Sequence, residues 1–191
     1  MRIHTYFENL YDYSYPVLCK FKDSWESKGY EVVVHTFHQA LGHPLLKEYL
    51  ASIERFPVTN YIEYELCCFR RWLAYDSSIK DEDIVILADY DIINVSLTEF
   101  PKYTVPTEYY AVGLLQIPLY VVRQFIHFVI SIPDWRLDPK HNSDMTLMIN
   151  HFTLPKRDYS FVSEWPDTSK PLIHFRGTGK KRELICFKFP L

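Results

Sequence analysis

The chain has 191 residues, the size of one domain with a substantial hydrophobic core. Hydrophobic residues make up 48% and aromatic residues 17%, which excludes a disordered chain, and a net charge of −3 offers no basic face for nucleic acid. The four cysteines have neither zinc-site spacing nor a disulfide framework, so we expect a reducing compartment.

The N-terminal segment Met1-Arg2-Ile3-His4 lacks the apolar core of a signal peptide. The most apolar stretch, 111–132, is interrupted by Gln116, Pro118 and Arg123, which argues against a membrane span. We therefore expect a cytoplasmic protein.

Strands alternate with helices in the first half of the chain. The expected elements are a strand at 2–7, a helix at 17–28 ending at Gly29, a strand at 30–37, helices at 44–55 and 61–75, and a strand at 84–88. This order predicts an α/β fold with a mostly parallel central sheet and helices on both faces.

The second half is less regular. The expected elements are a loop at 98–106, a strand at 109–117 continuing through Gly113, a helix at 119–130, a loop at 133–142, a helix at 143–151 capped by Ser143, and a strand at 172–175. A glycine-containing basic tail, 176–182, suits an anionic group, although contact with solvent alone explains it. The chain stops just past an expected strand near 187–191, which fits a fragment of a longer polypeptide.

Two carboxylates follow the most strand-like segment of the chain. The apolar run 84–88 has the length of a strand buried on both faces, and Asp89 and Asp91 come where it leaves the core. Because side chains alternate along an extended chain, both acids can converge on one divalent cation, which would receive phosphate oxygens. A chance match is the alternative; a second copy, Asp81-Glu82-Asp83, precedes the strand and is expected to be a solvated turn.

Three motifs together resemble a known family. Arg71-Trp72 lies eighteen residues before Asp89, Leu87 to Ile92 reads Leu-Ala-Asp-Tyr-Asp-Ile, and the C-terminal part reads Ile173-His174-Phe175-x-Gly177-x-x-Lys180. These resemble motifs of nucleotide-sugar glycosyltransferases with the GT-A fold, and the retaining, glycogenin-like members in particular. The order of elements is most similar to glycosyltransferase domains of chlorella viruses, which implies a viral protein in the host cytoplasm.

The resemblance implies a fold and a reaction. It implies a single GT-A domain over 1–191, with a Rossmann-like nucleotide-binding half at about 1–95 and an acceptor half at about 96–191. The reaction would move a hexose from a UDP-sugar to a hydroxyl of a glycan or glycoprotein acceptor, with retention of configuration. We expect a monomer.

The resemblance also implies roles for individual residues. Metal ligands for Mn²⁺ or Mg²⁺ would be Asp89, Asp91 and His174. Residues that bind the nucleotide sugar would be Thr5, Tyr6, Phe7, Arg71, Asp89, Tyr90, Gly177 and Lys180, the first three lining a uridine pocket. Catalytic residues would be Arg71 and Asp144, the latter near the reacting sugar.

Each of these residues also has a plainer interpretation. His174 can be a packed core histidine, Arg71 a solvated residue, and Asp144 a partner of the dipole of its helix. Thr5, Tyr6 and Phe7 can be simple core residues. The family strand that matches Ala111-Val112-Gly113 has an asparagine where this chain has Ala111, so the donor sugar stays open.

Two other functions remain open at this point. The first is a sugar- or partner-binding domain without catalytic activity, such as a virion component. The second is a phosphatase or phosphotransferase with a nucleophilic first Asp; those enzymes continue with Gly-Thr, whereas this chain continues with Ile92-Ile93.

Overall fold

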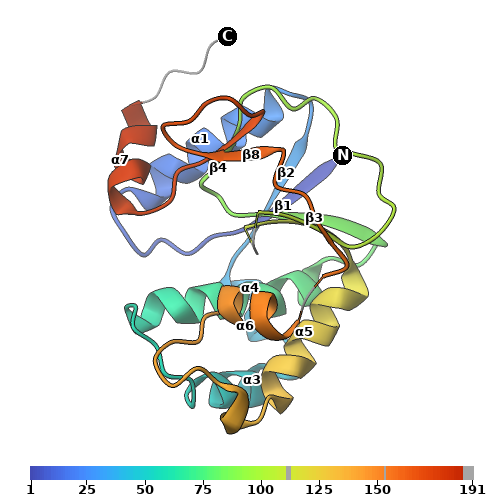
Figure 1. Cartoon of the computed structure of the whole chain (residues 1–191), viewed down its shortest axis with the longest axis vertical. Coiled ribbons are helices and arrows are strands. Elements are labelled where there is room, and N and C mark those ends of the chain that lie inside the picture. The colour runs from blue at the N-terminus through green and yellow to red at the C-terminus, as the bar shows by residue number, and fades with distance from the viewer. Residues whose placement is uncertain (111–112, 153, 187–191) are drawn as a thin grey trace.

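A six-stranded sheet runs through the middle of the molecule (Figure 1). The structure is a computed structural model, which describes residues 1–110, 113–152 and 154–186. In spatial order the strands are β2 (Glu31–His35), β1 (Arg2–Tyr6), β3 (Ile84–Ala88), β6 (Leu114–Pro118), β5 (Thr107–Tyr110) and β7 (Lys156–Arg157). β1 is parallel to both β2 and β3, as the alternation of strands and helices in the first half predicts.

The sheet becomes mixed at β6, which is antiparallel to β3 and to β5. The expected single strand through Gly113 is therefore wrong, because β5 and β6 form a hairpin at this point. The N–H of Gly113 donates to the carbonyl of Tyr110 at 2.7 Å and closes the turn. The apolar residues continue on both sides of the turn, so the sequence pattern hides the reversal. Ala111 and Val112 lie outside the described residues.

Helices and a second, smaller sheet cover the two faces (Figure 1). One face carries α2 (Phe37–Leu41), α3 (Leu46–Ile53), α4 (Ile62–Ser78), α5 (Leu119–Ser131) and α6 (Asp144–His151). The other carries α1 (Ser14–Glu26), α7 (Thr178–Cys186) and the sheet β4 (Ile92–Asn94), β9 (Leu172–His174) and β8 (Val162–Glu164). The predicted α/β class with helices on both faces is confirmed.

Two aromatic cores hold these layers together. On one face Trp72 and Phe125 pack with ring centroids 4.5 Å apart, which joins α4 to α5. On the other face Trp25 of α1 is fully buried, and its indole N–H donates to the carbonyl of Ile92 in β4 at 2.9 Å. Large buried aromatic side chains contribute much of the hydrophobic stabilisation of such layers.

The remaining differences from the predicted elements are local. Helix α1 begins at Ser14, three residues before the expected start, because Pro16 is tolerated in a first helical turn. Strands β4, β7 and β8 and helices α2 and α7 were not predicted, and the basic tail enters α7 at Thr178. The expected strand near 187–191 lies outside the described residues. Within the described ranges, no helix combines the length and apolar character that crossing a membrane requires.

Candidate active site

A cavity of about 320 Å³ opens where β3 ends, between α4, α6 and the start of α7. Its walls come from distant parts of the sequence, from Tyr6 at the end of β1 to Lys181 in α7. Five acidic and three basic residues line it: Glu8, Glu65, Asp89, Asp91 and Asp144, with Arg71, Arg176 and Lys181. A concave site with convergent charged groups at the end of a central strand is where an α/β fold binds ligands.

Two basic side chains lie against Asp91. Its carboxylate lies 2.8 Å from Lys181 Nζ, and its other oxygen lies 3.3 Å from His174 Nε2. The cause is strand register, because β4 pairs with β9 so that Ile92 stands opposite His174. Burial opposes ionisation of Asp91, but the charge of Lys181, with His174, outweighs it and lowers the pKa of Asp91 below its usual range.

Asp89 has a different environment, although it is only two residues away. Its Oδ1 accepts a hydrogen bond of 2.5 Å from Arg71. Burial and the neighbouring charge of Asp91 nevertheless raise the pKa of Asp89, while Arg71 acts in the opposite direction. The two carboxylates of the motif therefore have unequal proton affinities, which is common where two acids share one site.

Arg71 lies between Asp89 and Asp144 and contacts both. Its Nε donates to Asp144 Oδ2 at 2.8 Å, and the indole N–H of Trp72 donates to the same oxygen at 2.9 Å. Burial disfavours the charge on Arg71, but Asp144 and Asp89 outweigh it and raise the pKa of Arg71 well above its usual value. The interpretation of Arg71 as a solvated residue is wrong, since it is only 8% exposed.

Asp144 is the first residue of helix α6, and the start of this helix fixes its position. Ser143 caps α6, accepting from the N–H of Thr146 at 3.1 Å, so Asp144 falls in the first turn and is buried against α4. The predicted N-cap at Ser143 is confirmed. Asp144 contacts Arg71 and Trp72 directly, so the helix dipole alone does not account for its position.

Gly113 makes room for the Asp89 carboxylate. A Cβ atom at position 113 would lie 3.0 Å from Asp89 Oδ2 and 3.2 Å from the carbonyl of Tyr110. The carbonyl of Gly113 also accepts from the N–H of Asp89 at 2.7 Å. The hairpin turn thus holds the backbone of Asp89 by a hydrogen bond and leaves room for its carboxylate.

The donors around Asp91 suit a hard divalent ion. Asp91 Oδ1 is buried with only the 3.3 Å contact to His174 Nε2, and His174 Nδ1 is buried without a hydrogen-bond partner. Among the described residues, no three His, Cys, Asp or Glu side chains form a metal-holding group, since Asp89 is turned to Arg71. Asp91 and His174 therefore fit two positions of a metal shell, and Asp89 requires a change of partner to complete a third.

The structure brings most of the predicted site residues to this cavity. Those that line it are Tyr6, Arg71, Asp89, Tyr90, Asp91, Asp144, His174 and Gly177. Thr5 and Phe7 do not line it: Thr5 is fully buried beside β2, and Phe7 packs edge-on against Tyr90.

Lys181, and not the predicted Lys180, lines the cavity. Its ammonium group also lies 5.2 Å from the centre of the Tyr90 ring, within the range of a cation–π contact. Consecutive helical residues point about 100° apart, so the helical form of the tail selects one lysine. The sequence motif gives the number of residues between Gly177 and Lys180, but it does not give the rotation of α7 that decides which lysine faces the cavity.

A second group of cavity residues shares no motif in the sequence, although His141 is a weaker candidate there for a general base. Asn60, Glu65 and His141 line the cavity together, although they belong to a loop, to α4 and to the loop before α6. Glu65 falls on the buried side of its helix and His141 is 82 residues from its neighbour Thr59, so no local pattern connects them.

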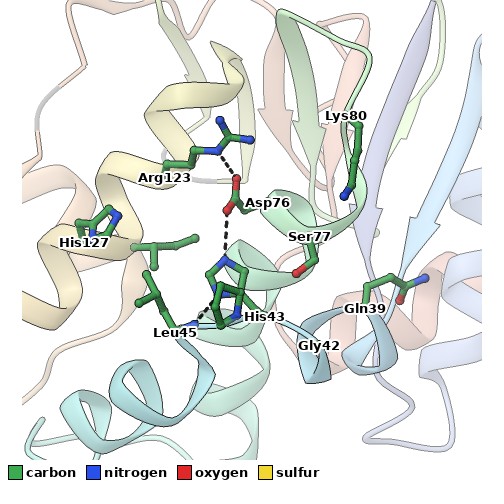
Figure 2. A pocket seen from close by; sticks show the side chains of 11 residues that line it. Gln39, Gly42, His43, Leu45, Asp76, Ser77, Lys80, Arg123 and His127 are labelled. Atoms are coloured by element: carbon green, nitrogen blue, oxygen red, sulfur yellow. Dashed lines mark hydrogen bonds and ion pairs between the residues drawn. The ribbon is translucent and has the colours of Figure 1, made fainter.

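A larger cavity of about 560 Å³ lies elsewhere, between α2, the end of α4 and α5 (Figure 2). Three of its ionisable groups satisfy one another: His43 Nε2 lies 3.1 Å from Asp76, whose other oxygen accepts from Arg123 at 2.6 Å. His43 Nδ1 accepts from the N–H of Leu45. This chain of bonds stabilises the contact between α4 and α5, and the reactive groups gather in the smaller cavity instead.

Comparisons of sequence find neither a matching family model nor a matching curated protein. Comparisons of structure find glycosyltransferases. One is a glycosyltransferase involved in the glycosylation of the major capsid of PBCV-1, with a TM-score of 0.58, 10% identity, and coverage of 97% of this chain and 98% of that one. Another is an active-site mutant of LgtC, with a TM-score of 0.59, 14% identity, and coverage of 96% and 95%. The chain therefore has the GT-A fold, as its motifs imply.

Proposed function

We propose that this chain is a metal-dependent glycosyltransferase that moves a hexose from a UDP-sugar to a hydroxyl of a glycan or glycoprotein acceptor. The observation that carries the proposal is the cavity at the exit of β3, where Asp89, Asp91, His174, Arg71 and Lys181 converge. The two structurally similar glycosyltransferases support the reaction class through their shared fold.

The charge of the cavity supports a divalent cation. Its acidic residues outnumber its basic ones, so a diphosphate would meet net repulsion without added positive charge. Asp91, His174 and Asp89 would hold Mn²⁺ or Mg²⁺, and the imidazole favours Mn²⁺. When bound, the metal supplies positive charge that offsets the charge of the departing diphosphate.

Residues of the chain itself would bind the diphosphate, the sugar and the nucleotide. Lys181 would turn from Asp91 toward a phosphate oxygen, and Arg71 would face the sugar and the diphosphate. Tyr6 and Tyr90 would border the nucleotide, with the backbone at Gly177 close to the phosphates. Thr5 and Phe7 would support these contacts from behind.

We further propose that the configuration of the sugar is retained. Inversion needs a free general base near the acceptor hydroxyl, and Asp144 is bound instead by Arg71 and Trp72. In a retaining transfer the departing diphosphate accepts the acceptor's proton on the same face. Proton NMR of the first product tests this, because an anomeric coupling opposite to that of the donor means inversion.

Calorimetry tests the core of the proposal. UDP is expected to bind with Mn²⁺ and much more weakly in EDTA, and Asp91→Asn is expected to remove this difference. Asp83→Asn is the matched control, because Asp83 is an exposed acid at the other end of β3. Equal UDP affinity in Mn²⁺ and in EDTA would contradict metal dependence. A double Ala variant at Asp89 and Asp91 that keeps its affinity for free sugars would favour the sugar-binding domain without activity.

A further inference from the structure

Glu65 is a buried carboxylate without a role in the chemistry described above. It lies in the first turn of α4 with no exposed surface, yet it lines the cavity. Its Oε1 accepts a hydrogen bond from the side chain of Asn60, while its Oε2 is buried and has no hydrogen-bond partner. A buried carboxylate oxygen without a partner is costly, so Oε2 favours contact with a hydrogen-bond donor that enters the cavity. Burial also raises the pKa of Glu65.

His141 has a fixed tautomer beside Glu65. The backbone N–H of Thr59 lies 3.2 Å from His141 Nδ1, which therefore acts as the acceptor. In the neutral ring the proton must then be on Nε2, which lies 3.8 Å from Glu65 Oε1. This distance is too long for a hydrogen bond, so the Nε2–H is available to an oxygen that enters the cavity.

Contacts separate this group from the part of the cavity that suits the diphosphate. Lys181 and His174 contact Asp91, and Arg71 connects Asp89 with Asp144. Glu65 contacts Asn60 and His141 instead. A carboxylate repels phosphate, whereas a sugar hydroxyl both donates and accepts.

We propose that Asn60, Glu65 and His141 form the subsite that binds a hydroxyl group of the acceptor sugar other than the hydroxyl that attacks the donor. The hydroxyl donates to the carboxylate of Glu65 and accepts from the Nε2–H of His141. Asn60 holds the carboxylate in place through Oε1. The subsite thus takes a neutral, polyhydroxylated acceptor, and it rests on the proposed glycosyl transfer for its place in the reaction.

Glu65→Gln tests the subsite with nearly unchanged side-chain volume. We expect the acceptor KM to rise roughly tenfold to a hundredfold, the effect of one lost hydrogen bond to a charged group. The donor KM and the slow hydrolysis of the donor by water are expected to stay unchanged. Glu63→Gln is the matched control, because Glu63 lies on the same helix with its side chain 46% exposed. A rise in donor KM alone, or no change in acceptor KM, would overturn the proposal.

A binding experiment without nucleotide separates this inference from the proposed function. Saturation-transfer NMR with methyl glycosides of glucose, galactose, mannose and xylose is expected to detect at least one of them on the wild-type chain and to lose that signal in Glu65→Gln. Thermal unfolding checks that the variant folds. If no glycoside binds the wild type, or if Glu65→Gln binds equally, the subsite is wrong even where calorimetry shows UDP bound with Mn²⁺. Glycoside binding without UDP binding would instead keep the subsite and reject the transferase.

Discussion

Arg71 contacts Asp144, which lies 73 positions away in the sequence, and makes the cavity one site. It donates to Asp89 at the end of β3 and to Asp144 at the start of α6. Taking an arginine out of water is costly, and two carboxylates compensate for that cost here. The same guanidinium occupies Asp89 Oδ1 in this structure, so the metal and the donor proposed above would have to redistribute these contacts.

Asp144→Asn is expected to leave a folded protein with reduced but measurable transfer activity. The amide removes one negative charge from buried Arg71, while Asp89 remains as its partner, so the free energy of unfolding should fall by about 2 kcal/mol, less than for a fully broken buried pair. Urea unfolding and initial rates check the two effects. Complete loss of activity at unchanged stability would make Asp144 the general base and favour inversion.

A chain of buried histidines gives a pH-dependent stability. His4 and His35 are hydrogen-bonded at 2.9 Å, His4 faces Glu82, and Ser78 closes the chain at His35. Burial, with the charge of His4, lowers the pKa of His35 to about 4, below the ordinary 6.5. As the pH falls, His35 becomes protonated in the unfolded state before it does in the native state. The contribution of neutral His35 to the free energy of unfolding is therefore complete above pH 6.5 and is lost as the pH drops toward 4.

Unfolding in urea between about pH 7 and about pH 4.5 measures this loss, which should be on the order of 3 kcal/mol from His35. His35→Gln should unfold with a flatter pH dependence than the wild type. His38→Gln is the control, because His38 is exposed on the neighbouring helix α2. An equally steep dependence in His35→Gln would place the titrating group elsewhere.

The rotation of helix α7 places only one of two adjacent lysines, Lys180 and Lys181, in the cavity. Lys181 contacts Asp91 and Tyr90, whereas Lys180 does not line the cavity. Lys181→Met is therefore expected to weaken UDP binding in the presence of Mn²⁺ by roughly tenfold or more, since a charge-assisted contact to phosphate is lost. Lys180→Met should have little effect, and calorimetry of both variants checks the difference. The opposite order would mean that the family spacing, with Lys180 as the phosphate ligand, holds in the bound state.

The thermal stability of the whole molecule should rise most with the sugar nucleotide that is its donor. The cavity takes residues from Tyr6 to Lys181, so a ligand bound there connects segments that must separate on unfolding. At a hundredfold excess over its Kd, a ligand adds about 2.7 kcal/mol. For a chain of this length that corresponds to a rise in Tm of roughly 5–10 °C. A thermal-shift panel of UDP-, GDP- and CMP-sugars, with and without Mn²⁺, should single out UDP-hexoses. A shift by free sugars alone would favour a binding domain without activity.

The sequence by itself determined the features that depend on neighbouring residues. The apolar run of β3, the placement of Asp89 and Asp91 at its end, the helical spacing of α4 and the cap at Ser143 follow from local periodicity and local hydrogen bonds. The resemblance of three short motifs identified the GT-A fold, which the structural comparisons confirm. The assigned roles of the site residues remain predictions.

Only the tertiary structure decided which side chains meet. It turned Arg71 inward, placed Lys181 instead of Lys180 in the cavity, reversed the chain at Gly113, and brought Glu65 beside His141. These contacts join segments that are far apart in the sequence, and they depend on helix rotation and strand register. Neither quantity leaves a periodic signal in the chain, because both are set by how whole elements pack against each other.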